Sequence, residues 1–137
     1  MNVEPLSREN LAEAHRVLAQ LRTELSVERL ERFIDDDLYE FRVYREAEGV
    51  AVCGFRMLET ITRHVHCHIH DLVVDERARG SGLGRAVIDE MRAHAAERGA
   101  RWLFLDGIDA ALGFYERLGF ERHAATLLKL PVAPESR

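Results

Sequence analysis

The fold is decided by residues 71–85, which read Asp71-Leu72-Val73-Val74-Asp75-Glu76-Arg77-Ala78-Arg79-Gly80-Ser81-Gly82-Leu83-Gly84-Arg85. The apolar start suits a strand, the three close glycines suit a sharp turn, and helical periodicity begins at Leu83. Free N–H groups at a helix N-terminus attract anions, above all phosphate, and Arg79 and Arg85 add positive charge beside them. The stretch therefore predicts a strand, an anion-binding loop and a helix.

Three phosphate ligands compete for this loop. A P-loop ends in Gly-Lys followed by Ser or Thr, whereas Gly84 is followed by Arg85 and Ala86. A dinucleotide loop has the spacing G-x-G-x-x-G and usually opens the first strand-helix unit, but here the glycines follow Gly80-x-Gly82-x-Gly84 after about 80 residues. The third ligand is the pyrophosphate of coenzyme A. Spacing alone does not separate this ligand from a plain glycine turn before a helix.

Outward from the loop, changes of hydrophobic period predict the remaining elements. Antiparallel hairpins followed by a strand-helix-strand crossover predict an α/β (α+β) fold with a central mixed, largely antiparallel sheet and helices on both faces. The expected elements are a helix capped by Ser7 with apolar positions to Leu25, a helix capped by Ser26 and ended by Asp35-Asp36-Asp37, strands at 39–44, 50–58 and 64–74 with a turn at Glu48-Gly49, a helix at 83–98 capped by Gly99, a strand at 101–106, a helix capped by Asp109 and ended by Gly119, and a last strand at 120–130.

Composition limits the class of protein. With 137 residues, 47% hydrophobic and 31% charged, the chain suits a single globular domain, 1–137. A net charge of -5 offers no basic excess for nucleic acid. Cys53 and Cys67 sit in apolar or alternating runs and are expected to be buried, reduced thiols. No apolar run reaches the roughly 20 residues of a membrane helix, and Met1 to Pro5 do not resemble a signal peptide, so a cytoplasmic location is expected.

Two motifs resemble signatures of the GNAT N-acetyltransferase superfamily. Arg79-x-x-Gly82-x-Gly84 resembles the first signature, R/Q-x-x-G-x-G/A, and lies between a strand and an apolar helix as in that family. About 35 residues further on, Gly113-Phe114-Tyr115-Glu116-Arg117-Leu118-Gly119-Phe120 resembles the second, F-Y-E-x-L-G-F. The similarity covers roughly Leu38 to Leu130. Two signatures in the right order are far more specific than either one alone.

The resemblance implies a GNAT-like acyltransferase fold and acetyl-CoA as cosubstrate. It implies that backbone groups of Leu72, Val73 and Val74 pair with the pantetheine arm like an added strand. Tyr115 would protonate the leaving thiolate, and Phe114 would line the cofactor channel. Many family members carry an Asn near the position of Ile108, so one cofactor contact is missing here or comes from Asp106 or Asp109. The pyrophosphate would be cradled by Arg79, Gly80, Ser81, Gly82, Leu83, Gly84 and Arg85.

Acetyl transfer also needs a neutral amine and a donor for the developing oxyanion, which the Val74 N–H could supply. Four histidines, His64, His66, His68 and His70, alternate along the third strand, and His68 falls where the resemblance places an acidic base in some members. A second interpretation is that these histidines line a half-polar sheet face, and Glu59 is a further base candidate. A metal site would require the strand to bend, since alternate Cβ atoms lie about 7 Å apart, so no metal is expected.

The sequence therefore predicts an enzyme that moves an acetyl group from acetyl-CoA to a small amine or peptide amine by direct attack, with Tyr115 and His68 as catalytic residues. The alternative is a non-catalytic acyl-CoA-binding or regulatory module of the same fold. Neither nucleic acid nor a membrane is an expected partner, and a homodimer is left open. The acceptor would contact the first helices, residues 58–63 and the last strand, and the run Asp35 to Asp37 hints at a cationic acceptor.

Overall fold

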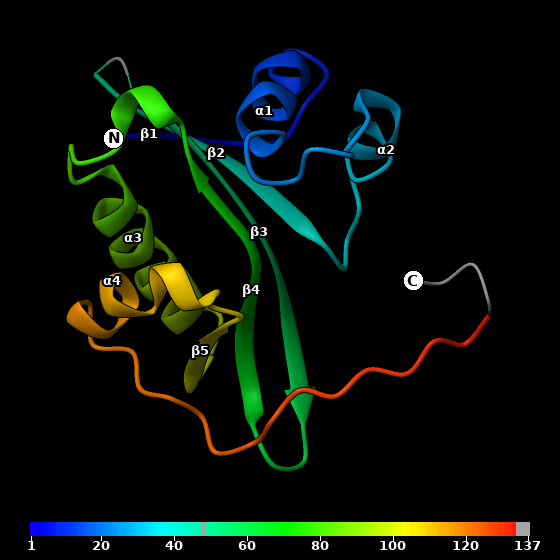
Figure 1. The fold of residues 1–137 in the computed structure, drawn as a ribbon, viewed down its shortest axis with the longest axis vertical. Coiled ribbons are helices and arrows are strands. Elements are labelled where there is room, and N and C mark those ends of the chain that lie inside the picture. The colour runs from blue at the N-terminus through cyan, green and yellow to red at the C-terminus, as the bar shows by residue number, and fades with distance from the viewer. Residues whose placement is uncertain (48, 134–137) are drawn as a thin grey trace. The chain divides into compact units, whose positions relative to one another are not determined.

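The computed structural model describes residues 1–47 and 49–133. The chain forms two compact units, Met1–Asp106 and Gly107–Arg137, and each is described by itself. Figure 1 follows the chain through both units. Within the described residues, no helix combines the length and the apolar character that a membrane crossing requires.

The first unit is built on one five-stranded sheet with the spatial order β1-β2-β3-β4-β5. The first four strands pair antiparallel, and β5 pairs parallel to β4. This mixed, largely antiparallel sheet confirms the predicted fold class. The strands are β1 (Asn2–Pro5), β2 (Glu40–Glu46), β3 (Gly49–Thr60), β4 (His64–Val74) and β5 (Trp102–Leu105).

Helices cover both faces of this sheet (Figure 1). On one face α1 (Leu11–Leu18) and α2 (Val27–Glu31) pack over a core that includes Val43, Val52 and Val73. On the other face lies α3 (Leu83–Glu97), whose Glu90 carboxylate accepts a hydrogen bond from the buried Tyr44 hydroxyl at 2.8 Å. Because side chains alternate across a strand, successive residues of β2 and β3 pack alternately on the α1–α2 side and on the α3 side of the sheet.

The long helix agrees with its sequence pattern. Its buried residues are the five that helical spacing predicts, and Gly99 just beyond it adopts a positive φ of 85°, which suits a glycine that ends a helix. The two cysteines, Cys53 and Cys67, are buried free thiols, as expected. The buried residues of α3 are Leu83, Val87, Ile88, Met91 and Ala95.

A β-bulge interrupts the pairing of β3 with β4. Gly54 pairs with Asp71 and Phe55 pairs with Ile69, so His70 is the extra residue on β4. The bulge shifts the alternation of β4. As a result, the consecutive residues His70 and Asp71 both lie near Tyr39 on the α1–α2 face. The predicted third strand is therefore present over its full range, but its second half is out of phase with its first.

The second unit is described from residue 107 to 133. A short 3-10 helix, η2 (Asp109–Ala111), leads into α4 (Leu112–Arg117). The predicted cap Asp109 begins η2, whereas α4 starts after Ala111 without a side-chain cap. Gly119 has a φ of 101° and follows the last turn, as predicted for the end of this helix.

Several sequence predictions were wrong. The strand expected at 120–130 is absent, and its residues Leu127, Leu128 and Leu130 are exposed. A strand requires a hydrogen-bonding partner, which an apolar pattern does not provide by itself. The N-terminal residues, to which no strand had been assigned, form β1 and pair with β2.

Smaller differences concern helix ends and one turn. The first helix ends at Leu18, so Leu21 and Leu25 lie beyond it. Its N-cap is Asn10, which exchanges hydrogen bonds with the predicted cap Ser7: Ser7 N–H donates to Asn10 Oδ1 at 2.8 Å, and Asn10 N–H donates to Ser7 Oγ at 3.4 Å. Ser26 caps α2 as predicted. The turn assigned to residues 48 and 49 lies partly outside the described residues, and Gly49 is already the first residue of β3.

Candidate active site

The glycine loop lies between a short 3-10 helix, η1 (Glu76–Ala78), and α3. Gly80 and Gly82 have φ angles of 82° and 88°, a region that favours glycine, and a Cβ on either one would meet no atom within 4 Å. Gly82 is the N-cap of α3. The first N–H groups of a helix lack intrahelical acceptors, and among the described residues Leu83 N–H donates only to Ser81 Oγ, at a long 3.4 Å. The loop thus presents exposed backbone at a helix N-terminus.

The buried carboxylate of Asp75 holds the start of this loop. Its two oxygens accept hydrogen bonds from Arg16 at 2.9 Å, from Gln20 at 3.2 Å and from the Arg77 guanidinium at 3.1 Å. Gln20 also accepts a hydrogen bond from the Glu76 N–H at 2.9 Å. The Arg16 hydrogen bond, supported by Gln20 and Arg77, holds the pKa of Asp75 well below its usual range despite burial. Asp75 therefore ties α1 to the junction of β4 and the loop.

One edge of β4 is open just before the loop. The parallel pairing of β4 with β5 ends at Ile69 and Leu105. Within the described residues of the first unit, no strand pairs with the β5-facing edge of β4 from His70 to Val74. The Asp75 N–H donates to Val50 O on β3 at 2.8 Å. Since backbone groups alternate along a strand, those of Leu72 and Val74 face the open edge.

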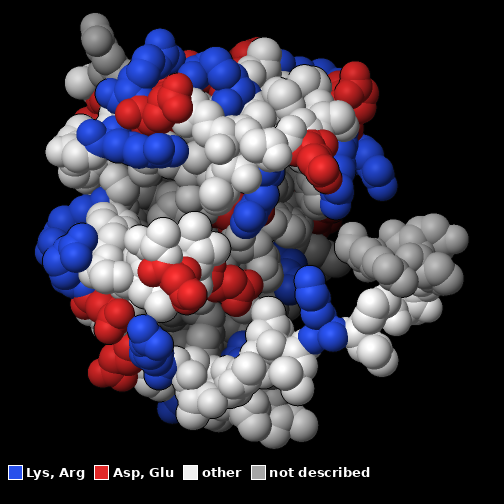
Figure 2. Space-filling view, viewed as in Figure 1, with Lys and Arg blue, Asp and Glu red and all other residues white. Residues whose placement is uncertain are grey.

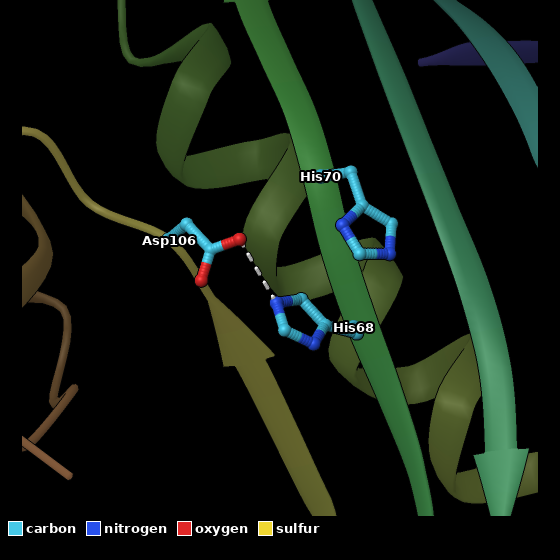
Figure 3. A group of neighbouring side chains, drawn as sticks. All are labelled: His68, His70 and Asp106. Carbon is cyan, nitrogen blue, oxygen red and sulfur yellow. Dashed lines mark hydrogen bonds and ion pairs between the residues drawn. The ribbon is translucent and has the colours of Figure 1, made fainter. Parts of the chain in front are cut away.

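His68, His70 and Asp106 form a cluster beside this edge (Figure 3). His68 Nε2 lies 3.2 Å from Asp106 Oδ2, and the His68 ring stacks on the His70 ring with centroids 4.4 Å apart. One potential ligand atom from each residue lies within 4.8 Å of the others, an arrangement that a metal ion could use. The side chain of His68 is 16% exposed and that of Asp106 is 55% exposed, so solutes can reach the cluster.

The other histidines of β4 differ in their surroundings. His70 Nε2 lies 2.9 Å from the Nε of Arg56 on β3. Burial, followed by the neighbouring His68 and Arg56, lowers the pKa of His70 below that of an ordinary histidine. His66 is 1% exposed and packs edge-on against Phe104, which matches the interpretation of a histidine that lines the sheet. His64 is exposed and has a φ of 56°.

A cavity of about 460 Å³ opens between the α1–α2 segment and the sheet. Its wall includes Tyr39 and Asp71, whose hydroxyl and carboxylate are hydrogen-bonded, and Arg22, whose Nε donates to Asp71 Oδ1 at 2.9 Å. Burial and the Asp71 carboxylate raise the pKa of Tyr39. Tyr39 also lies 5.4 Å from the His70 ring, centroid to centroid, so the cavity adjoins the histidine cluster. Its further lining residues are Leu18, Thr23, Glu24, Leu25, Arg29, Leu30, Phe33 and Phe41.

Tyr115 and Phe114 lie on α4 in the second unit. The Tyr115 ring is 5.2 Å from Phe114 and 5.7 Å from Phe120, centroid to centroid. The Tyr115 carbonyl accepts hydrogen bonds from Leu118 N–H and Phe120 N–H, at 3.0 and 3.1 Å, which closes the helix end. The roles assigned to the Tyr115 hydroxyl and to the Phe114 ring stay predictions.

Sequence reasoning missed the contacts of the histidines. The parallel register places His68 opposite Phe104 and Ile69 opposite Leu105, which brings the following residue, Asp106, within reach of His68. An acidic residue directly after a strand was visible in the sequence, but the register was not. Arg56 was not identified at all, because a single arginine in a strand carries no motif.

Sequence comparison identifies the family. The chain matches the model of the Acetyltransferase (GNAT) family over residues 8–120. It is 30% identical over 123 residues to an uncharacterized N-acetyltransferase of Bacillus subtilis (strain 168), covering 83% of this chain and 87% of the relative. It is 43% identical over 56 residues to glucosamine 6-phosphate N-acetyltransferase of Trypanosoma brucei brucei, covering 41% of this chain and 38% of that one. The chain spans about two fifths of the length of the first relatives that it matches, 38% of one and 40% of another.

Solved structures agree on the fold. The ribosomal-protein-alanine N-acetyltransferase from Brucella melitensis biovar Abortus 2308 superposes with a TM-score of 0.80 at 18% identity, over 94% of this chain and 98% of that one. An acetyltransferase of Trypanosoma brucei superposes with a TM-score of 0.73 at 27% identity, over 94% and 99%. The family match covers both predicted signatures up to Phe120, and the first of them forms an open loop at a helix N-terminus. This chain belongs to the GNAT acetyltransferase family.

Proposed function

We propose that this protein is an N-acetyltransferase that moves the acetyl group of acetyl-CoA directly to the amine of a small acceptor. The observation that carries the proposal is the open edge of β4, which is followed, after the short helix η1, by the glycine loop at the N-terminus of α3. An extended pantetheine arm can add to such an edge as a strand does, and a pyrophosphate suits the N–H groups of a helix start.

In this proposal the backbone of Leu72 and Val74 pairs with the pantetheine arm, while that of Val73 faces β3. The pyrophosphate meets the N–H groups of residues 80–85, with the exposed side chains of Arg79 and Arg85 beside it. The Leu83 side chain is 2% exposed and belongs to the core, so Leu83 contributes only its backbone. The Val74 N–H at the open edge is the donor for the thioester oxygen as it becomes negative.

His68 is the proposed general base. When neutral, it holds its proton on Nε2, where Asp106 accepts it at 3.2 Å, and its Nδ1 carries the lone pair. Nδ1 takes the proton of the ammonium group, directly or through water, and the freed amine attacks the thioester carbon. The carbon–sulfur bond then breaks, and the coenzyme A thiolate takes a proton from the Tyr115 hydroxyl. The attacking nitrogen loses its second proton as the amide forms, and a proton returned through solvent restores the Tyr115 phenol. The family's second signature and the pKa of roughly 10 of an ordinary phenol support the role of Tyr115 as the acid.

The cavity of about 460 Å³ beside His70 is the proposed acceptor site. Its lining carries acidic and basic groups, among them Glu24, Asp71 and Arg29, and rings such as Phe33. This mixture suits a small polar amine that also carries hydroxyl or anionic groups. Several relatives are glucosamine 6-phosphate N-acetyltransferases by name, so amino sugars and their phosphates are the first acceptors to test. Figure 2 shows acidic and basic side chains interspersed on the face it presents, with no broad area of one sign.

The test has two steps. Calorimetric titration with acetyl-CoA measures whether the loop binds the cosubstrate, and release of free thiol with a panel of amines measures turnover. Binding and turnover with at least one amine support the proposal. Binding without turnover on any amine, including amino sugars and peptide amines, favours the non-catalytic acyl-CoA-binding module. Absence of binding would mean that the glycine loop is only a structural turn.

A further inference from the structure

Arg56 on β3 determines which nitrogen of His70 carries the proton. The Arg56 Nε–H donates to His70 Nε2 at 2.9 Å. A guanidinium group has only donors and stays protonated in proteins, so the atom that faces it must offer a lone pair. The neutral His70 ring therefore carries its hydrogen on Nδ1. The register of the sheet creates this contact, because Arg56 is the direct cross-strand partner of His68 and reaches the histidine that follows it on the same face.

The same contact bears on metal binding at the cluster of His68, His70 and Asp106. A histidine that ligates a metal uses a bare nitrogen, and its other nitrogen usually donates a hydrogen bond to an oxygen. At His70 the lone pair of Nε2 accepts from Arg56, which leaves Nδ1 as the nitrogen that carries the hydrogen of the neutral ring. If Nδ1 were to ligate, Nε2–H would point at another donor. Neither nitrogen of His70 is open to a metal while Arg56 is in place.

We propose that Arg56 is a positioning residue that keeps His70 as a neutral, Nδ1-protonated ring, so that His68 alone accepts a proton and divalent metals do not occupy the cluster. The role of His68 as acceptor rests on the proposed function. The rings of His68 and His70 are stacked with centroids 4.4 Å apart, so a positive charge on His70 would oppose the uptake of a proton by His68. A donor fixed against His70 Nε2 removes the site at which His70 would gain that charge.

The first experiment is nitrogen NMR of the full chain with labelled histidine. In the parent, His70 should show a protonated Nδ1 and a bare Nε2, and Arg56→Lys, which keeps a donor, should largely preserve that pattern. Arg56→Met should lose it. The control is Arg101→Met, an exposed arginine directly before β5, which should leave the signals of His70 unchanged. A protonated Nε2 in the parent, or an unchanged His70 in Arg56→Met, overturns the proposal.

The second experiment titrates each protein with Zn²⁺ alone, followed by calorimetry. Arg56→Met should bind Zn²⁺ about 10- to 100-fold more tightly than the parent, the usual size of effects from groups around metal ligands. Adding His68→Ala should abolish the gain. Equal Zn²⁺ affinity in parent and Arg56→Met, or tight stoichiometric binding by the parent, overturns the exclusion of metals.

Both readouts are independent of acetyl transfer. If the tautomer and the metal response behave as expected but no amine is acetylated, the proposed function fails while the role of Arg56 at His70 stands. If Arg56→Met does not fold, as judged by thermal unfolding, the spectra of the parent and of Arg56→Lys still decide the tautomer. When turnover is measurable, Arg56→Met should lower kcat more than it raises KM, and Arg56→Lys should recover part of that loss.

Discussion

Arg16 in α1 and Asp75 at the end of β4 are 59 positions apart and are joined by a hydrogen-bonded ion pair of 2.9 Å. The Asp75 side chain is 2% exposed, and it is the only buried acidic side chain among the described residues. The pair lies where β4 turns into the glycine loop. It therefore couples the stability of the first unit to the position of the proposed cofactor site.

Asp75→Asn should lower the stability of the protein by about 1.5–3 kcal/mol at neutral pH, the range for hydrogen bonds to charged groups. Because the pKa of Asp75 is lowered in the folded state, the carboxylate stabilises the fold above its unfolded pKa, about 3.9. That contribution is lost as the pH falls from there towards the folded pKa. The difference in unfolding temperature between parent and variant should thus shrink in acid. Asp89→Asn, at an exposed position on α3, is the control and should change little at any pH.

Gly82→Val should abolish binding of acetyl-CoA, since it places a branched side chain on the loop that meets the pyrophosphate. Gly82 has a φ of 88°, so the substitution also strains the backbone. Gly99→Val is a matched control, because Gly99 has a φ of 85° at the other end of the same helix and its Cβ would also meet no atom within 4 Å. Calorimetric titration should show loss of binding only for Gly82→Val. Equal weakening in both variants would point to strain in α3 instead of a contact with the cofactor.

Tyr115→Phe should lower kcat by roughly 10²- to 10⁴-fold, the usual range for a general acid, with little change in acetyl-CoA affinity. The ring is kept, so the unfolding temperature should stay near that of the parent. Tyr44→Phe provides the contrast, since the Tyr44 hydroxyl donates to Glu90 at 2.8 Å in the core. That variant should lose about 1 kcal/mol of stability and keep its turnover. Normal kcat in Tyr115→Phe would mean that the thiolate leaves unaided or takes a proton from water.

His68→Gln should lower kcat by about 10²-fold or more if His68 is the general base. Asp106→Asn should have a smaller effect in the same direction, because Asp106 contacts the His68 ring at 3.2 Å and is not itself the base in the proposed mechanism. The double variant should be no slower than His68→Gln alone, since the two residues act as one unit. His64→Asn, at an exposed position of the same strand with a φ of 56°, is the control. Additive losses in the double variant would contradict a shared role.

Much of the first unit could be predicted because its signals are local. The buried stripe of α3 follows from helical spacing, and the bounds of β4, His64–Val74, follow from a continuous run between turns. The open loop follows from three glycines before a helix. Each of these features depends on residues a few positions apart, whose backbone conformation and exposure are coupled directly.

The sequence by itself determined the family, the glycine loop and the mixed sheet, since motifs and periodicity are written in neighbouring residues. Only the tertiary structure decided that residues 2–5 form a strand, that residues 120–130 do not, and that His68 meets Asp106 while His70 meets Arg56. These outcomes depend on which strands pair and in which register, and on the bulge at His70. Register is set by packing among distant segments, so a shift of one residue would have brought different side chains together without altering any local pattern.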